Sequence, residues 1–210
     1  MPFDCVTLAA EASAPQPLYL VEEVSHRVIN EYAEAISTLS LAAARSASFQ
    51  ARATLRDAAN RLRAHAEAHR ALLAPASAGQ IALADHLDFV CASMANASLS
   101  ERGVRLLVQT DEVWMDAGRC WRVGLIVVEL IRNAARHGLG GGPGAIGVSI
   151  VDEAGCVSCV VSDNGRPPPA LRPGRGCRLV EILARELRGS ASWRFTPDGC
   201  TAKVTFPAAG

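Results

Sequence analysis

Two helical stripes of apolar residues in the first third of the sequence constrain the fold most strongly. Apolar side chains recur at the three-and-four spacing of an α-helix between residues 17 and 44, and again between residues 49 and 73. Ser46, Ser48 and Phe49 between them predict a turn. We therefore expect an antiparallel helical hairpin over residues 17–74. The stripes comprise Val21, Val24, Val28, Tyr32, Ala35, Ile36 and Leu39, and then Leu55, Ala58, Leu62, Ala66, His69 and Leu73.

A lone hairpin leaves part of its apolar stripe exposed to water. Two chains can cover these stripes by pairing their hairpins into a four-helix bundle. The sequence therefore predicts a homodimer formed through residues 17–73.

His26 lies on the first predicted helix but away from its apolar stripe. It shares a polar face with Glu22, Glu23, Asn30, Ala33 and Ser37, so it should be exposed. A largely neutral imidazole can attack a phosphoryl group or transfer a proton. Taken alone, such a residue is more often an ordinary surface histidine. On the second helix, His69 is expected to be a packed histidine, and His65 and His69 lack a third ligand for a metal.

The remaining residues predict a second unit at 81–208, after a lead-in at 1–16 and a linker at 75–79. Its expected strands and helices form an α/β sandwich with helices on one face of the sheet, so the fold class is α+β. We expect helices at 85–100, 118–137 and 176–187, and strands at 104–108, 113–115, 146–151, 156–161, 190–195 and 201–206.

Composition excludes several classes of function. The chain is electrically neutral and its arginines are spread along the sequence, so no nucleic-acid partner is expected. No apolar run approaches the roughly 18 residues that span a bilayer, so we expect a cytoplasmic protein without membrane contact. Cys156 and Cys159 should point to opposite faces of a strand, which argues against a zinc or redox pair.

Three polar segments of the second unit suit a nucleotide. Glu129 and Asn133 are one helical turn apart, with Arg136 and His137 following, so an amide oxygen could bind Mg²⁺ and a guanidinium could meet phosphate. Asp163 could accept a hydrogen bond from an exocyclic amine, and Gly165 would let a flat ring approach. Gly174 and Gly176 precede a helix, whose N-terminus could hold a phosphate.

The order of these segments resembles the cytoplasmic part of bacterial sensor histidine kinases, specifically the HWE-type group and its relatives. His26, Arg27 and Asn30 resemble the H-R-x-x-N phosphoacceptor box, and residues 61–73 resemble the second-helix pattern. Residues 124–138 are similar to the N box, 163–165 to the D box and 174–180 to the G box. The resemblance implies a phosphoacceptor hairpin followed by an ATPase domain of the histidine kinase, gyrase and Hsp90 type.

By the same resemblance, ATP phosphorylates His26, which passes the phosphoryl group to an aspartate of a response-regulator receiver domain. Asn133 is implied as the Mg²⁺ ligand, Glu129 as the polar residue that assists the attack, and Asp163 as the adenine contact. The glycines of the G box would form a mobile lid, with Arg136, His137 and Gly165 beside the nucleotide. The input signal is expected to arrive through a separate sensor protein or through the N-terminal segment.

The segment after the D box departs from the family pattern. Arg166 is followed by three prolines, and the stretch before Gly174 is short, so the lid is expected to be stiff. Three interpretations stay open: a histidine kinase, a histidine phosphotransferase relay whose second unit no longer uses ATP, and an ATPase or serine kinase without a phosphoacceptor. We rank them in this order, because the last leaves His26 and Arg27 unexplained.

Overall fold

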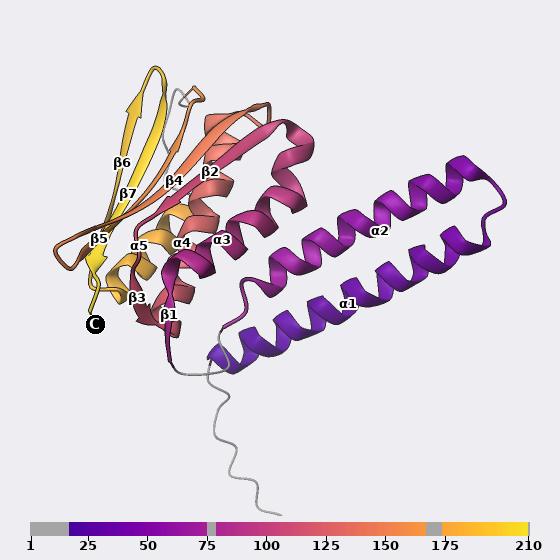
Figure 1. The fold of residues 1–210 in the computed structure, drawn as a ribbon, viewed down its shortest axis with the longest axis horizontal. Coiled ribbons are helices and arrows are strands. Elements are labelled where there is room, and N and C mark those ends of the chain that lie inside the picture. The colour runs from indigo at the N-terminus through magenta and orange to yellow at the C-terminus, as the bar shows by residue number, and fades with distance from the viewer. Residues whose placement is uncertain (1–16, 75–78, 167–173, 210) are drawn as a thin grey trace, which may run out of the picture.

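The computed structural model describes residues 17–74, 79–166 and 174–209, with the side chains of the first helix from Arg27 onward. The expected lead-in at 1–16, most of the expected linker and the proline-rich segment at 167–173 lie outside these ranges. Within them, a helical hairpin is followed by a mixed sheet covered by helices (Figure 1). The fold class predicted from the sequence is confirmed.

The hairpin consists of α1 (Pro17–Arg45) and α2 (Phe49–Arg70). Ser48 caps α2, and its hydroxyl accepts a hydrogen bond from the backbone N–H of Ala51 at 3.3 Å. Ala43 and Ala59 are each only 2% exposed, so small side chains let the helices approach closely. Among the described helices, none combines the length and the apolar character needed to cross a bilayer.

A five-stranded sheet forms the centre of the second part of the chain, which we call the sheet unit. Its order is β2-β4-β5-β7-β6; β2 and β4 are parallel and the other neighbours are antiparallel. The strands are β2 (Val104–Thr110), β4 (Gly144–Glu153), β5 (Cys156–Asp163), β6 (Ser190–Thr196) and β7 (Gly199–Pro207).

Three helices cover one face of this sheet: α3 (Leu83–Met94), α4 (Ala117–Asn133) and α5 (Arg175–Glu186) (Figure 1). On β5, Val157 and Cys159 are buried against the helices and Cys156 on the opposite face is exposed, although Ser158 on that face is buried. The predicted opposite orientation of the two cysteines is therefore correct. A π-helical turn extends α3 over Ala95–Leu99 and α4 over Ala134–Gly138, and a 3₁₀ turn follows at Ser100–Arg102.

A short ribbon joins the start of the sheet unit to α4. It pairs β1 (Gln80–Ala82) antiparallel with β3 (Trp114–Asp116). The sequence analysis expected the second strand but not the first. A strand of three residues is too short to show an alternation of apolar and polar side chains. We could therefore not predict β1, which is recognised by its pairing with β3.

The hairpin is fastened to the sheet unit at the end of α2. Ala71 is 5% exposed and belongs to the hydrophobic core of the sheet unit, with Leu72 packed against it. The indole N–H of Trp121 on α4 donates to the carbonyl oxygen of Leu72 at 3.0 Å. Arg61 and Glu101 add an exposed ion pair at 3.0 Å. The residues just after α2 therefore attach the hairpin to the core of the sheet unit.

Gly189 offers a test of the packing between α5 and the sheet. A β-carbon at this position would overlap the backbone carbonyl of Thr205 on β7, which cannot move without disturbing the strand pair. We expect Gly189→Ala to lower the free energy of unfolding by about 1–3 kcal/mol, measured by urea denaturation. Gly79→Ala is the control, because its β-carbon would meet nothing within 4 Å. Equal losses in both variants would contradict this assignment.

Candidate functional site

The polar face of α1 is exposed as the sequence predicts. Asn30, Ala33 and Ser37 are all exposed, whereas Val28 and Ile36 are partly buried. His26 lies within α1, one turn before Asn30, and its side chain falls outside the described residues. Helical geometry extends the exposed face to position 26.

Near the sheet unit, the two hairpin helices meet through an aromatic contact. The rings of Tyr32 and His69 have centroids 5.5 Å apart and are tilted by 43°. Burial, followed by the charges of Arg132 and His65, lowers the pKa of His69 below its usual value. His69 packs against Tyr32 as predicted, but it is exposed and does not belong to the core, because it lies on the last turn of α2.

Glu129 and Asn133 lie together on α4 and face the first turn of α5. A β-carbon at Gly176 would lie 2.9 Å from Oε2 of Glu129 and 3.4 Å from the side-chain amide of Asn133, so these side chains lie close against the backbone of α5. Nδ2 of Asn133 is buried without a hydrogen-bond partner in the described part of the chain. Oε1 of Glu129 accepts a hydrogen bond from Arg132 at 3.0 Å. The structure thus brings three of the predicted site residues together: Glu129, Asn133 and Gly176.

Asp163 and Gly165 form a second cluster at the end of α4. The backbone N–H of Gly165 donates to Oδ1 of Asp163 at 3.0 Å, and the N–H of Arg166 donates to the carbonyl oxygen of Gly138, also at 3.0 Å. Side chains at Gly138 and Gly165 would overlap Asp163 and the Gly138 carbonyl group respectively. The turn after β5 therefore packs directly against the end of α4.

Burial raises the pKa of the Asp163 carboxyl group above its ordinary value. The backbone N–H groups of Gly165 and Cys200 act in the opposite direction, since both donate to the carboxylate, but burial is the larger cause. The carboxylate already has partners within the chain. It is therefore only partly available to an exocyclic amine.

The other predicted site residues are more open. Arg136 and His137 are exposed on the π-helical turn after α4, and neither makes a side-chain hydrogen bond within the described ranges. Gly174 precedes α5, and a β-carbon there would meet nothing within 4 Å. Among the described residues, no group of three or more histidine, cysteine or acidic side chains could hold a metal ion.

Sequence reasoning missed two residues at this site. Arg132 forms an ion pair with Glu129. This pair could have been predicted, because side chains three residues apart on a helix are neighbours. Gly138 was expected only to end the helix, but its missing side chain makes room for Asp163. The residues around Gly138 do not predict this contact, because Gly138 and Asp163 are 25 positions apart in the sequence.

A family model described as "Histidine kinase" matches residues 23–98, which include His26 and most of the hairpin. The chain resembles a bacterial sensor histidine kinase core. The resemblance inferred from the sequence motifs is thereby confirmed. None of the curated proteins matches the sequence.

Solved structures with a histidine kinase core share this fold. The histidine kinase domain of Erythrobacter litoralis EL346 blue-light activated histidine kinase is 21% identical, with a TM-score of 0.60 over 85% of this chain and 96% of that one. The histidine kinase AdeS from Acinetobacter baumannii is 12% identical, with a TM-score of 0.53 over 89% and 96%. A bacterial phosphotransferase is 14% identical, with a TM-score of 0.61 over 89% and 93%. At these identities the likeness shows the fold.

Asp163 should make stability depend on pH. Because burial raises its folded-state pKa above 3.8, the ionised carboxylate destabilises the native state once the pH exceeds that value. We expect Asp163→Asn to raise the free energy of unfolding at pH 7, and the gain to shrink towards zero as the pH falls through the folded-state pKa. Urea denaturation from pH 3 to 8 measures this. The exposed Asp198→Asn serves as control, and a pH-independent difference would refute the assignment.

Proposed function

We propose that this protein transfers phosphoryl groups through His26 to and from an aspartate of a response-regulator receiver domain. One observation carries the proposal: His26 lies in the segment that matches the histidine kinase family, at a position of α1 that helical periodicity groups with the exposed Asn30, Ala33 and Ser37. A ring nitrogen of His26 attacks phosphorus, so an N–P bond forms as the bond to the donor oxygen breaks. Attack by a receiver carboxylate reverses the step. Phosphoryl transfer needs mainly positioning, which an accessible histidine on a rigid helix provides.

The phosphoryl group can come from ATP or from a phosphorylated receiver aspartate. In the first case Asn133 would offer an oxygen to Mg²⁺, Glu129 would assist the attack, and Arg136, His137 and Gly174 would lie near the phosphates. The buried, unpartnered Nδ2 of Asn133 would suit donation to a phosphate oxygen, and the space at Gly174 is open. The phosphate side of the site is therefore compatible with ATP.

The adenine side fits poorly. An adenine contact requires a free carboxylate at Asp163 and open space at Gly165. Instead, the carboxylate accepts backbone hydrogen bonds, and the backbone of Gly138 takes up the space beside Gly165. Binding of adenine would first have to separate the turn after β5 from the end of α4.

The attachment of the hairpin also favours a relay. Autophosphorylation requires the nucleotide and the histidine to approach each other, and a movement between the two parts of the chain would have to break the Trp121–Leu72 hydrogen bond and expose Ala71. A relay needs only an accessible histidine. The similar structures include a bacterial phosphotransferase as well as histidine kinases, so they support both candidate functions. We therefore propose a histidine phosphotransferase relay, with an ATP-dependent histidine kinase as the second candidate function.

Labelling with two phosphoryl donors tests this choice. A ³²P-phosphorylated receiver domain should transfer acid-labile, alkali-stable label to the wild-type chain and none to His26→Ala. With γ-labelled ATP and Mg²⁺, the wild type should stay unlabelled. Label from ATP that Asn133→Ala abolishes would instead establish the kinase. Absence of label from both donors, over a panel of receiver domains, would refute phosphotransfer through His26.

We also propose that the chain is a homodimer. Val28, Tyr32 and Ile36 on α1 and Leu55 and Leu62 on α2 are only partly buried within one hairpin. A second hairpin would cover them, since burying apolar surface stabilises the bundle. Analytical ultracentrifugation at micromolar concentration should give twice the mass of 22.1 kDa. Leu62→Glu should shift the protein towards the monomer; a monomeric wild type would overturn the proposal.

A further inference from the structure

Cys177 lies in the first turn of α5 and faces the sheet. Val180 and Ala184, three and seven residues further along the helix, are both 0% exposed. Residues at this spacing share one face of a helix, so Cys177 belongs to the buried stripe of α5. Because it stands at the end of that stripe, its side chain is only partly buried.

Cys200 continues the inward face of β7. Every second residue that follows it on this strand is buried under the helices: Ala202 is 5% exposed, Val204 0% and Phe206 1%. Side chains two residues apart on a strand point to the same face of the sheet, so Cys200 also points towards the helix layer. It is partly buried, like Cys177.

The two cysteines lie at the same end of the contact between α5 and β7. At the other end, a β-carbon at Gly189, just after α5, would lie 2.8 Å from the β-carbon of Phe206. Cys177 precedes Gly189 by a distance of about 18 Å, at 1.5 Å for each helical residue. Cys200 precedes Phe206 by about 20 Å, at 3.3 Å for each residue of a strand. The two thiols therefore come level and face each other across the interface.

The ionisation of Cys200 agrees with this placement. Burial, followed by the charges of Asp163 and Cys177, raises the pKa of Cys200 to about 11. Because the effect of a charge falls off with distance, both groups lie near the Cys200 thiol. The backbone N–H of Cys200 also donates to the Asp163 carboxylate. The cysteine pair therefore lies beside the cluster formed by Asp163 and Gly165.

Cys91, Cys159 and Cys156 are placed differently from this pair. Burial, followed by the charge of Cys91, raises the pKa of Cys159 to about 12, but these two side chains are only 2% and 0% exposed. An oxidant in solution does not reach them. Cys156 is exposed but lies on the face of the sheet away from α5. Cys177 and Cys200 combine a neighbouring thiol with access to solvent.

We propose that a peroxide joins Cys177 and Cys200 in a reversible disulfide. The sulfur of Cys177 attacks an oxygen atom of hydrogen peroxide. An S–O bond forms, the O–O bond breaks and water leaves with the thiol proton, so that a sulfenic acid remains. The sulfur of Cys200 then attacks the sulfur of Cys177; an S–S bond forms as the S–O bond breaks, and a second water leaves. The two thiols lose two electrons in total, and the peroxide gains them.

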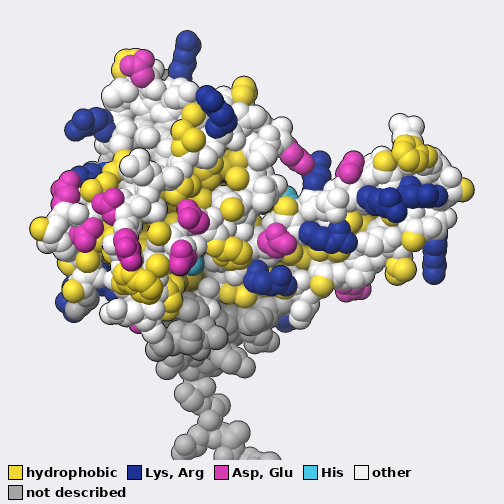
Figure 2. Space-filling model, in the orientation of Figure 1, with side chains coloured by type: hydrophobic (Ala, Val, Ile, Leu, Met, Phe, Trp, Pro, Cys, Tyr) yellow, Lys and Arg dark blue, Asp and Glu magenta, His cyan; other side chains and the backbone are white. Residues whose placement is uncertain are grey.

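Hydrogen peroxide suits this site because it is small and uncharged. Figure 2 shows both acidic and basic side chains on the surface of the sheet unit, and neither kind repels a neutral molecule. Because burial raises the pKa of Cys200, its thiol is protonated at neutral pH and reacts slowly with an oxidant. Cys177 is therefore expected to react first.

The disulfide would fix α5 to the sheet. Such a bond requires the two Cα atoms to lie within about 7 Å, so it exists only while α5 stays packed on β7. Gly176, the residue before Cys177, lies against Glu129 and Asn133 of α4. The bond would hold these groups in the described arrangement, whereas in the reduced chain only packing opposes a movement of α5. This inference goes beyond the proposed function and does not depend on His26.

Peptide mapping tests whether the bond forms. Hydrogen peroxide is added to the wild-type chain until Cys156 is oxidised, and the remaining thiols are alkylated after denaturation. We expect mass spectrometry to find a peptide pair joined through Cys177 and Cys200, two hydrogens lighter than the separate peptides and released by dithiothreitol. Cys156→Ser is the control and should still form it, whereas Cys200→Ser should not. Free thiols, unlinked sulfur oxides or links to a second copy at both positions would overturn the inference.

Hydrogen exchange tests whether the bond fixes α5. The backbone amides of α5 should exchange more slowly in the oxidised chain than in the reduced chain, and the urea midpoint should rise by about 1 M. Dithiothreitol should reverse both changes, and Cys177→Ser given the same peroxide should show neither. Unchanged exchange of α5 in a fully cross-linked chain would overturn the second half of the inference. Neither measurement involves phosphoryl transfer, so its outcome is separate from that of the proposed relay.

Discussion

The burial of Ala71 in the core of the sheet unit is the contact on which the arrangement depends. It makes the end of α2 part of a hydrophobic core that also contains α3 and α4, and the Trp121–Leu72 hydrogen bond fixes the chain at that point. Because Tyr32 packs against His69 one half-turn earlier on α2, the orientation of α1 follows from the same attachment. The face that carries His26 is therefore placed by packing in the sheet unit.

Helix α4 has two roles in this arrangement. One face supplies core residues such as Val123 and Ile126, and another presents Glu129 and Asn133 to α5. Glu129 and Asn133 lie close against the backbone of Gly176, and the missing side chain of Gly138 makes room for Asp163 at the end of the helix. The glycines that could admit a nucleotide are thus also used to bring protein segments together. A site of this kind opens only if those segments separate.

Periodicity predicted most of the fold, because the elements with long amphipathic patterns bury one face each. The hairpin, α4 and the strands β4 to β7 all belong to this group. The failures involve contacts between distant positions: β1 exists through its pairing with β3, and His69 is exposed because of where α2 ends. Gly165 was recognised as a place of close approach, but the sequence could not identify Gly138 as the group that approaches it.

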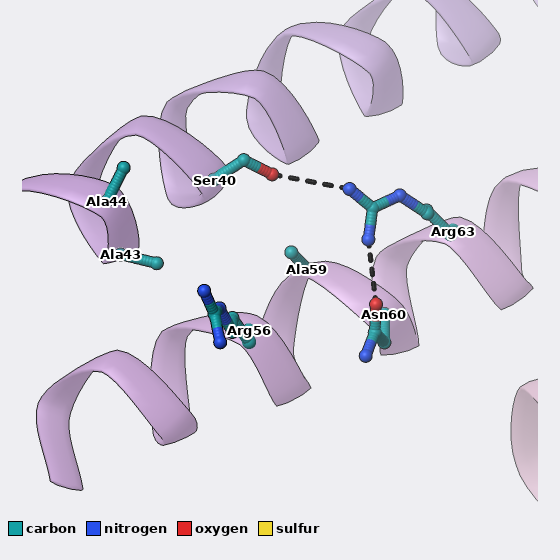
Figure 3. A pocket seen from close by; sticks show the side chains of 7 residues that line it. All are labelled: Ser40, Ala43, Ala44, Arg56, Ala59, Asn60 and Arg63. Atoms are coloured by element: carbon teal, nitrogen blue, oxygen red, sulfur yellow. Dashed lines mark hydrogen bonds between the residues drawn. The ribbon is translucent and has the colours of Figure 1, made fainter. Parts of the chain in front are cut away.

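The attachment of Ala71 and Leu72 to the core also suggests a use for the sheet unit in a phosphotransferase that does not bind ATP. Without that unit, Ala71 and Leu72 would be exposed and the end of α2 would lose its anchor. The fully buried residues between the two helices are small, such as Ala43 and Ala59 (Figure 3), so a single hairpin buries little apolar surface. In the proposed relay the sheet unit would be retained for support, and its nucleotide contacts could close without affecting a phosphoacceptor on the hairpin.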